Sequence, residues 1–273
     1  MTTNVQTASA APAAAPTTAT TAVPDAPGIS LGRLVQVELR KMVDTRSGFG
    51  LLAAILVIDL AAMLIVALAG ATDGLPFEGY LSILLQVQLV LLPIVGVLAA
   101  SQEWSQRTTL QTFALEPRRS RVIVAKIAAA LVLALVITVI SVAFAAGGHA
   151  LSAATDSAVT ADWALDSEII GGLLLNVVLY TLMGVAFGLL LHAPAIAIVL
   201  FFLLPMVLSA VSGLFPDLQD VLQWVDPSLA WTQMFMDDGM DATGWAQIAT
   251  SAAIWVVAPM VGGWYRTVRR EAA

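Results

Sequence analysis

Apolar residues are concentrated in six long runs along the chain, with short polar segments between them. The runs cover approximately residues 48–70, 79–100, 122–147, 167–190, 195–214 and 244–264. About 20 residues of α-helix cross the roughly 30 Å hydrocarbon core of a bilayer, and each run reaches that length. Runs this continuous fit helices and not the alternating strands of a membrane barrel. The pattern predicts an all-α integral membrane protein with six transmembrane helices over residues 48–264.

Two segments next to the spans show the spacing of an amphipathic helix. In residues 29–47, charged side chains lie opposite an apolar face made of Leu31, Leu34, Val35, Leu39, Met42 and Val43. We expect a helix that is capped by Ser30 and lies in the membrane interface. In the loop 215–243, the apolar spacing from Leu214 to Val225 predicts a second short helix that ends at Pro227.

The composition agrees with a membrane protein. Of the 273 residues, 59% are hydrophobic and 11% are charged, whereas soluble domains are about 45–50% apolar and about 25% charged. The absence of cysteine excludes disulfides and thiolate metal sites. Residues 1–28 are rich in Ala, Thr and Pro and lack the basic and leucine-rich parts of a signal peptide. We expect a disordered tail there, because so little apolar surface cannot offset the entropy of folding.

Positive charges are segregated to one predicted side of the membrane. The 12 Lys and Arg residues are Arg33, Arg40, Lys41, Arg46, Arg107, Arg118, Arg119, Arg121, Lys126, Arg266, Arg269 and Arg270. The loops 71–78, 148–166 and 215–243 contain acids but neither Lys nor Arg. Because Lys and Arg favour the cytoplasmic side, we expect both termini, the tail 265–273 and the loop 101–121 to be cytoplasmic, in the inner (plasma) membrane of the cell. Tryptophans near the outer ends fit an interfacial belt: Trp163, Trp224, Trp231 and Trp245.

The loop 101–121, SQEWSQRTTLQTFALEPRRSR, is more elaborate than a simple connection. Glu103 and Arg107 form an i, i+4 pair in the favourable order, and Leu110 continues the same helical stripe. Pro117 breaks the helix before a basic segment. Basic residues alone are sufficient for orientation, so the preceding helix, with polar and apolar faces, indicates a docking surface.

This loop and the six-span layout resemble the permease subunits of type-2 ABC exporters. That family typically has a glutamate and then Gly-Thr-Leu in the loop, followed by an apolar stretch, a proline, arginines and a lysine that enters the third span. The matching residues here are Glu103, Thr109, Leu110, Phe113, Ala114, Leu115, Pro117, Arg119, Arg121 and Lys126. Thr108 departs from the family pattern, which has glycine at that position.

The resemblance implies a function for the loop. In the family it is a coupling helix that seats on a separate ATP-binding subunit. The coupling residues implied here are Glu103, Arg107, Thr108, Thr109, Leu110, Phe113, Pro117, Arg119 and Arg121. The resemblance also implies a homodimer or heterodimer of permeases, export of a cargo such as a drug, lipid, glycan precursor or peptide, and ATP and Mg²⁺ on the partner subunit. Independently, this chain has no GxxxxGK[ST] phosphate-binding loop, because its two lysines follow Arg40 and Ala125.

Several polar residues fall within the predicted spans. Asp59 lies near the middle of the first span, and an intramembrane acid is a candidate functional residue. We expect it to be protonated or to face a wet cavity, hydrogen-bonded to Gln88. Asp59, Gln86, Gln88 and Asn176 form a candidate substrate pathway, although polar interhelical packing explains these residues as well. Gly184 and Gly188 form a GxxxG motif, which permits close helix packing.

The sequence also bears on two other classes of function. An intramembrane enzyme is disfavoured, because His149 and His192 fall on opposite sides of the membrane and neither HExxH nor a Gly-x-Ser-x-Gly motif is present. A membrane scaffold, or an immunity or regulatory subunit, fits the sequence as well but predicts no ATPase partner. The lipid bilayer is an expected partner in every case, and nucleic acid is not.

Overall fold

The computed structural model describes residues 29–68, 75–106, 108–155, 163–164, 167–235 and 240–269, and every regular element among them is helical. The α-helices are α1 (Leu31–Asp44), α2 (Arg46–Leu68), α3 (Phe77–Ser105), α4 (Thr109–Leu115), α5 (Arg119–Thr155), α6 (Ser167–Leu191), α7 (Pro194–Leu214), α8 (Gln219–Val225), α9 (Pro227–Thr232), α10 (Ala242–Ala252) and α11 (Ala258–Arg269). Short 3-10 turns, η1 (Pro216–Leu218) and η2 (Gln233–Phe235), and a π-helical turn, η3 (Ala253–Val257), complete the set. The tail 1–28, Arg107 and residues 270–273 lie outside the described residues.

Six of these helices are long and apolar enough to cross a membrane, which confirms the predicted fold class. They are α2, α3, α5, α6, α7 and the continuous helix formed by α10, η3 and α11. Several of them extend further than the apolar runs. Helix α5 continues to Thr155, and α3 continues to Ser105. The i, i+4 spacing predicted that Glu103 belongs to the short helix of the loop. In the structure, Glu103 belongs instead to the spanning helix α3.

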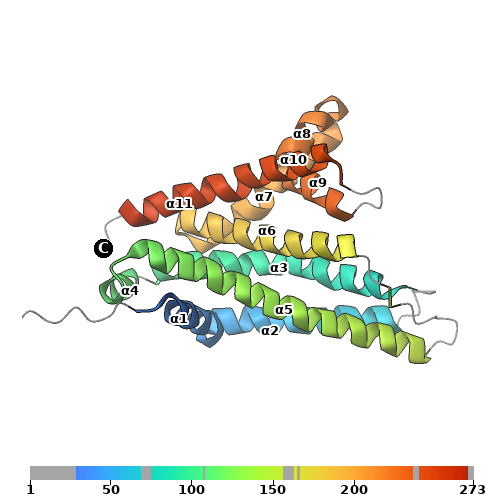
Figure 1. The fold of residues 1–273 in the computed structure, drawn as a ribbon, viewed down its shortest axis with the longest axis horizontal. Coiled ribbons are helices and arrows are strands. Elements are labelled where there is room, and N and C mark those ends of the chain that lie inside the picture. The colour runs from blue at the N-terminus through green and yellow to red at the C-terminus, as the bar shows by residue number, and fades with distance from the viewer. Residues whose placement is uncertain are drawn as a thin grey trace, which may run out of the picture.

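The long helices run side by side, with α3 and α6 in the middle of the bundle (Figure 1). The GxxxG motif of α6 lies against α3. A Cβ atom at Gly184 would stand 2.2 Å from the carbonyl oxygen of Pro93, and one at Gly188 would stand 2.7 Å from that of Val97. Real Cβ atoms do not approach carbonyl oxygens so closely. Glycine at these positions therefore allows the two helix backbones to pack in direct contact.

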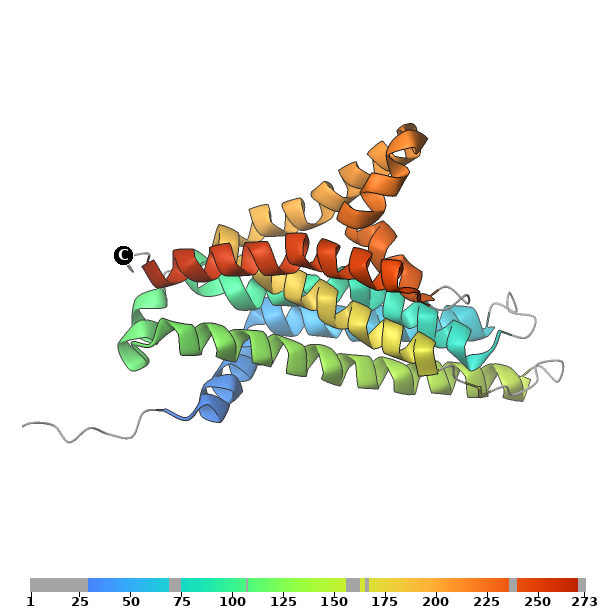
Figure 2. The same ribbon diagram turned by 45° about the horizontal axis from the view of Figure 1, so that its top comes forward.

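Helix α7 diverges from the bundle toward its C-terminal end, where α8 and α9 return the chain to it (Figure 2). Pro227 begins α9 instead of only ending α8. Asp226 caps the new helix by accepting a hydrogen bond from the Ser228 amide at 2.8 Å. Trp231 of α9 is fully buried, which corrects its assignment to the interfacial belt. One end of the bundle thus carries α1, α4 and the end of α11, and the opposite end carries α8 and α9 (Figure 1).

Candidate functional site

Four charged side chains form a closed cluster where α1, α3 and α5 meet at the α4 end of the bundle. The Lys41 ammonium lies 2.7 Å from Glu38 and 2.6 Å from Glu103. The Lys126 ammonium lies 2.8 Å from Glu38 and 3.3 Å from Glu103. Each lysine therefore bridges both carboxylates, and the cluster has no net charge. We call these four residues the ion-pair cluster.

The ion-pair cluster is largely hidden from solvent. Glu38, Glu103 and Lys126 are buried, and only Lys41 is partly exposed. Lys126 also donates to the carbonyl oxygen of Ala99 at 3.1 Å. Burial lowers the pKa of Lys41, but the negative charges of Glu103 and Glu38 outweigh that effect and raise the pKa above its ordinary value. Lys41 therefore remains charged at physiological pH, and the cluster holds three helices together through charge-assisted hydrogen bonds.

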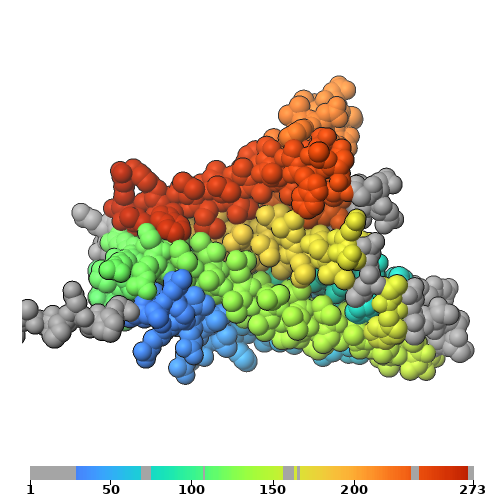
Figure 3. Space-filling view, viewed as in Figure 1, coloured from blue at the N-terminus to red at the C-terminus, as the bar shows by residue number. Residues whose placement is uncertain are grey.

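Helix α4 is attached to this cluster and to the neighbouring helices. The Thr112 hydroxyl donates to Glu103 at 2.9 Å. The Arg119 guanidinium lies 4.7 Å from the centre of the Phe113 ring and donates to the carbonyl oxygen of Thr267 in α11 at 3.0 Å. Arg121 pairs with Glu116 at 3.0 Å. These contacts fix α4 across the end of the bundle beside α1, as the space-filling view shows (Figure 3).

Other side chains of α4 are open to solvent. Leu110 and Leu115 are 53% and 76% exposed, and Pro117 and Arg118 next to them are also exposed. An apolar surface with an adjacent cation, at the tip of a membrane bundle, is suited to contact another protein.

The structure divides the predicted coupling residues into two groups. Leu110 and Pro117 are exposed, as docking requires, whereas Glu103 and Thr109 are buried and cannot touch a partner directly. Arg119 reaches back to α11, and Arg121 is held by Glu116 at the end of α4. Thr108 precedes α4 with φ −97°, a conformation open to any residue, so glycine is not needed there. Arg107 lies outside the described residues.

Glu38 is the functional candidate that the sequence patterns missed. It lies four residues after Leu34 and four before Met42, within the apolar stripe of α1. A carboxylate on the buried face of an amphipathic helix needs a buried cation, and that position was the available signal. The partner, Lys126, is 88 residues away, so spacing alone did not identify it.

A second polar group lies inside the bundle, between α2, α3 and α5. The Ser141 hydroxyl donates to Asp59 and accepts from the Gln88 side chain. Thr138 donates to the other end of Gln88 at 2.8 Å. Asp59 and Gln88 are thus linked through Ser141, and both are fully buried. This arrangement is that of an interhelical polar lock.

Ser141→Ala is expected to destabilise the fold by about 1–3 kcal/mol, because it leaves buried polar atoms of Asp59 and Gln88 without their partner. The midpoint of thermal unfolding in one detergent measures the effect. Ser82 is exposed on α3, so Ser82→Ala provides the control and should stay within about 0.5 kcal/mol of the parent. Equal shifts for the two variants would show that the lock contributes nothing.

The remaining two pathway residues line a separate cavity of about 410 Å³. It lies in the wedge between α3, α6, α7 and α9, and its lining residues are Gln86, Leu89, Val90, Asn176, Tyr180, Phe201, Phe202, Pro205, Met206, Ser228 and Thr232. Gln86 and Gln88 are two residues apart on α3, so their side chains point to different sides of it. The four predicted pathway residues therefore belong to two different places.

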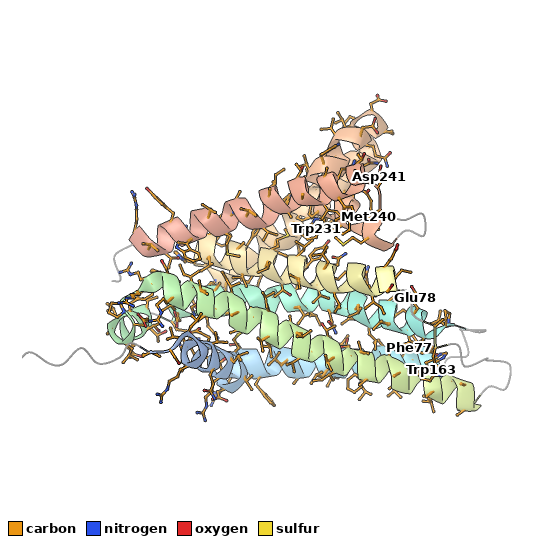
Figure 4. All side chains as sticks on the ribbon, viewed as in Figure 1. Phe77, Glu78, Trp163, Trp231, Met240 and Asp241 are labelled. Carbon is orange, nitrogen blue, oxygen red and sulfur yellow. The ribbon has the colours of Figure 1, made fainter. Side chains whose placement is uncertain are left out.

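The two histidines lie near opposite ends of the bundle. His192 stacks on Trp104 at 4.2 Å between ring centres, at the α4 end. His149 is buried near the opposite end, where its ring lies 4.7 Å from Trp163 and 6.2 Å from Phe77. Phe77 and Trp163 lie together in Figure 4. Among the residues that the structure describes, no group of His, Cys, Asp and Glu is arranged to hold a metal ion.

Two features of the described residues are thus suited to a function: α4 with its ion-pair cluster, and the cavity beside α7. A scan against protein-family models finds no match to the chain, and a search of curated proteins finds no matching sequence. The geometry and charges of these two features are therefore the basis for a functional proposal.

Proposed function

We propose that the chain is the membrane-spanning permease subunit of an ATP-driven exporter. It couples to a separate ATP-binding subunit through residues 101–121, and two permease chains, identical or different, pair in the membrane to form the pathway. ATP and Mg²⁺ bind to the partner subunit, since this sequence has no phosphate-binding loop. The resemblance of the loop to type-2 ABC permeases supports the proposal.

Helix α4 is the observation on which the proposal depends. It is a separate helix across the end of the bundle, in which Leu110 and Leu115 are exposed and Thr112 is bonded to Glu103. An ordinary connection between spans needs neither exposed apolar side chains nor a buried ionic attachment. A subunit that presses on α4 would act directly on the helices joined by the ion-pair cluster.

Helix α3 connects this attachment to the cavity. It carries Glu103 near one end and Gln86 closer to the other, about 26 Å apart at about 1.5 Å per residue. A tilt of α3 driven at Glu103 would therefore move one wall of the cavity. Helix α3 thus provides a physical route from α4 to the cavity.

Copurification tests the proposal. The tagged chain, extracted from its native membrane in a mild detergent, is expected to recover an ATPase with Walker motifs, identified by mass spectrometry. Leu115→Glu should reduce that recovery at least about tenfold, because it places a charge in the centre of the contact. Leu218→Glu is the matched control, since Leu218 is exposed on η1 at the opposite end, and it should leave recovery unchanged.

A membrane scaffold or regulatory subunit is the competing function. It predicts that no ATPase is recovered with the parent chain, and reproducible absence would refute the permease proposal. If Leu115→Glu and Leu218→Glu instead changed the recovery of the ATPase equally, the ATPase would bind elsewhere than on α4.

A further inference from the structure

The cavity beside α7 has a neutral lining. None of the described residues that line it is Lys, Arg, Asp or Glu. Its walls are mainly apolar and aromatic, with Tyr180 and Phe201 in edge contact at 6.3 Å. Its volume of about 410 Å³ falls within the range of about 300–1,000 Å³ that is usual for small-molecule sites. An ion would lose its hydration there without gaining a counter-charge from a lining side chain, so the lining disfavours charged ligands.

Asn176 gives the cavity a specific polar group. Its side chain is almost fully buried, and its amide nitrogen donates to the Trp231 carbonyl oxygen at 3.4 Å. A carbonyl oxygen only accepts, so the nitrogen must face Trp231 and Oδ1 is the other atom of the amide. That Oδ1 atom is buried and has no hydrogen-bond partner. A buried acceptor without a donor is costly, and a ligand donor would relieve that cost.

The cavity is also open toward the surface that the spans present to lipid. Val90 and Met206 line it and are exposed on α3 and α7. Ser228 and Thr232 of α9 add hydroxyl groups from the end of the bundle that carries α8. A molecule dissolved in the bilayer could therefore enter between α3 and α7, with its polar part directed toward Asn176 and α9.

We propose that this cavity binds an uncharged, largely apolar molecule that carries one hydrogen-bond donor, a hydroxyl or an N–H group, which donates to Asn176 Oδ1. The further step, that such a molecule is the exported substrate, rests on the proposed function. Binding itself requires neither ATP nor a partner subunit, so it can be measured on this chain alone.

Photolabelling in lipid nanodiscs tests the proposal. The neutral donor probe is para-hydroxymethyl benzophenone, its donor-free analogue is para-methyl benzophenone, and its anionic analogue is para-benzoylbenzoate. The hydroxymethyl probe is expected to label lining residues of α3, α6, α7 and α9, as mapped by peptide mass spectrometry. The anionic probe should label them at least about tenfold less.

Two variants and a control make the test specific. Asn176→Leu should raise the half-saturating concentration of the hydroxymethyl probe about fivefold, as expected for the loss of one hydrogen bond, and leave that of the methyl probe unchanged. Val90→Trp should fill the cavity and suppress labelling by both neutral probes. Val139→Trp is the control. Val90 and Val139 are both exposed on spanning helices, at 49% and 61%, but of the two only Val90 lines the cavity.

Three results would overturn the inference. They are labelling that spreads evenly over the lipid-facing helices, labelling that Val90→Trp does not reduce, and an unlabelled cavity, as expected if a second copy of the chain fills it. Val90→Trp changes an exposed position, so the test stays decisive if Asn176→Leu does not fold. Loss of ATPase copurification with normal labelling would refute the exporter and leave the binding site intact.

Discussion

Replacing Lys126 with methionine is expected to destabilise the folded chain by about 3–5 kcal/mol, which is the usual cost of removing one partner from a buried ion pair. Methionine keeps an apolar stem of similar length but leaves Glu38 and Glu103 to share the single cation of Lys41. Lys126 itself is 5% exposed, so water cannot replace the lost charge. Unfolding by SDS titration in mixed micelles measures the change in free energy.

The control for this prediction is Arg40→Met on α1. Arg40 forms an exposed i, i+4 pair with Asp44 at 3.2 Å, and exposed pairs of this kind contribute only about 0.3–0.5 kcal/mol. The double variant Lys126→Met with Glu38→Gln should lose less than the sum of the two single variants, because it removes the uncompensated charge. Equal losses for Lys126→Met and Arg40→Met would show that the ion-pair cluster does not hold α1, α3 and α5 together.

Gly184→Ala is expected to destabilise the fold by about 1–3 kcal/mol, the usual cost of overpacking. The added Cβ would lie 2.2 Å from the carbonyl oxygen of Pro93, which is a backbone atom and cannot rotate away. Helices α3 and α6 would have to separate, and α3 also carries one wall of the cavity. The same SDS titration measures the loss, and photolabelling of the cavity should change with it.

Gly50→Ala is the matched control for Gly184→Ala. Gly50 lies within α2, and a Cβ atom there meets nothing within 4 Å. The substitution should be neutral or should stabilise the helix by up to about 1 kcal/mol, because alanine has the higher helix propensity. If Gly184→Ala and Gly50→Ala had equally small effects on stability, the direct contact between the α3 and α6 backbones at Gly184 would be contradicted.

The sequence by itself determined the membrane-spanning elements. A helix in lipid must satisfy its own backbone hydrogen bonds, so a continuous apolar run of about 20 residues is sufficient to predict a span. The same local reasoning predicted the helix after Ser30, which α1 forms with Ser30 as its cap. The GxxxG spacing also predicted close packing at Gly184, since small residues four apart share one helix face.

Only the tertiary structure decided which polar groups meet. Spacing shows which residues share a face of one helix, but the rotation and offset of neighbouring helices depend on how all their side chains pack. Glu38 meets Lys126 across 88 residues, and Ser141 reaches Asp59 across 82. In the same way, Asn176 and Gln86 line one cavity, whereas Asp59 and Gln88 are buried elsewhere in the bundle. The apolar runs therefore fixed what crosses the membrane, and packing between helices fixed where its chemistry lies.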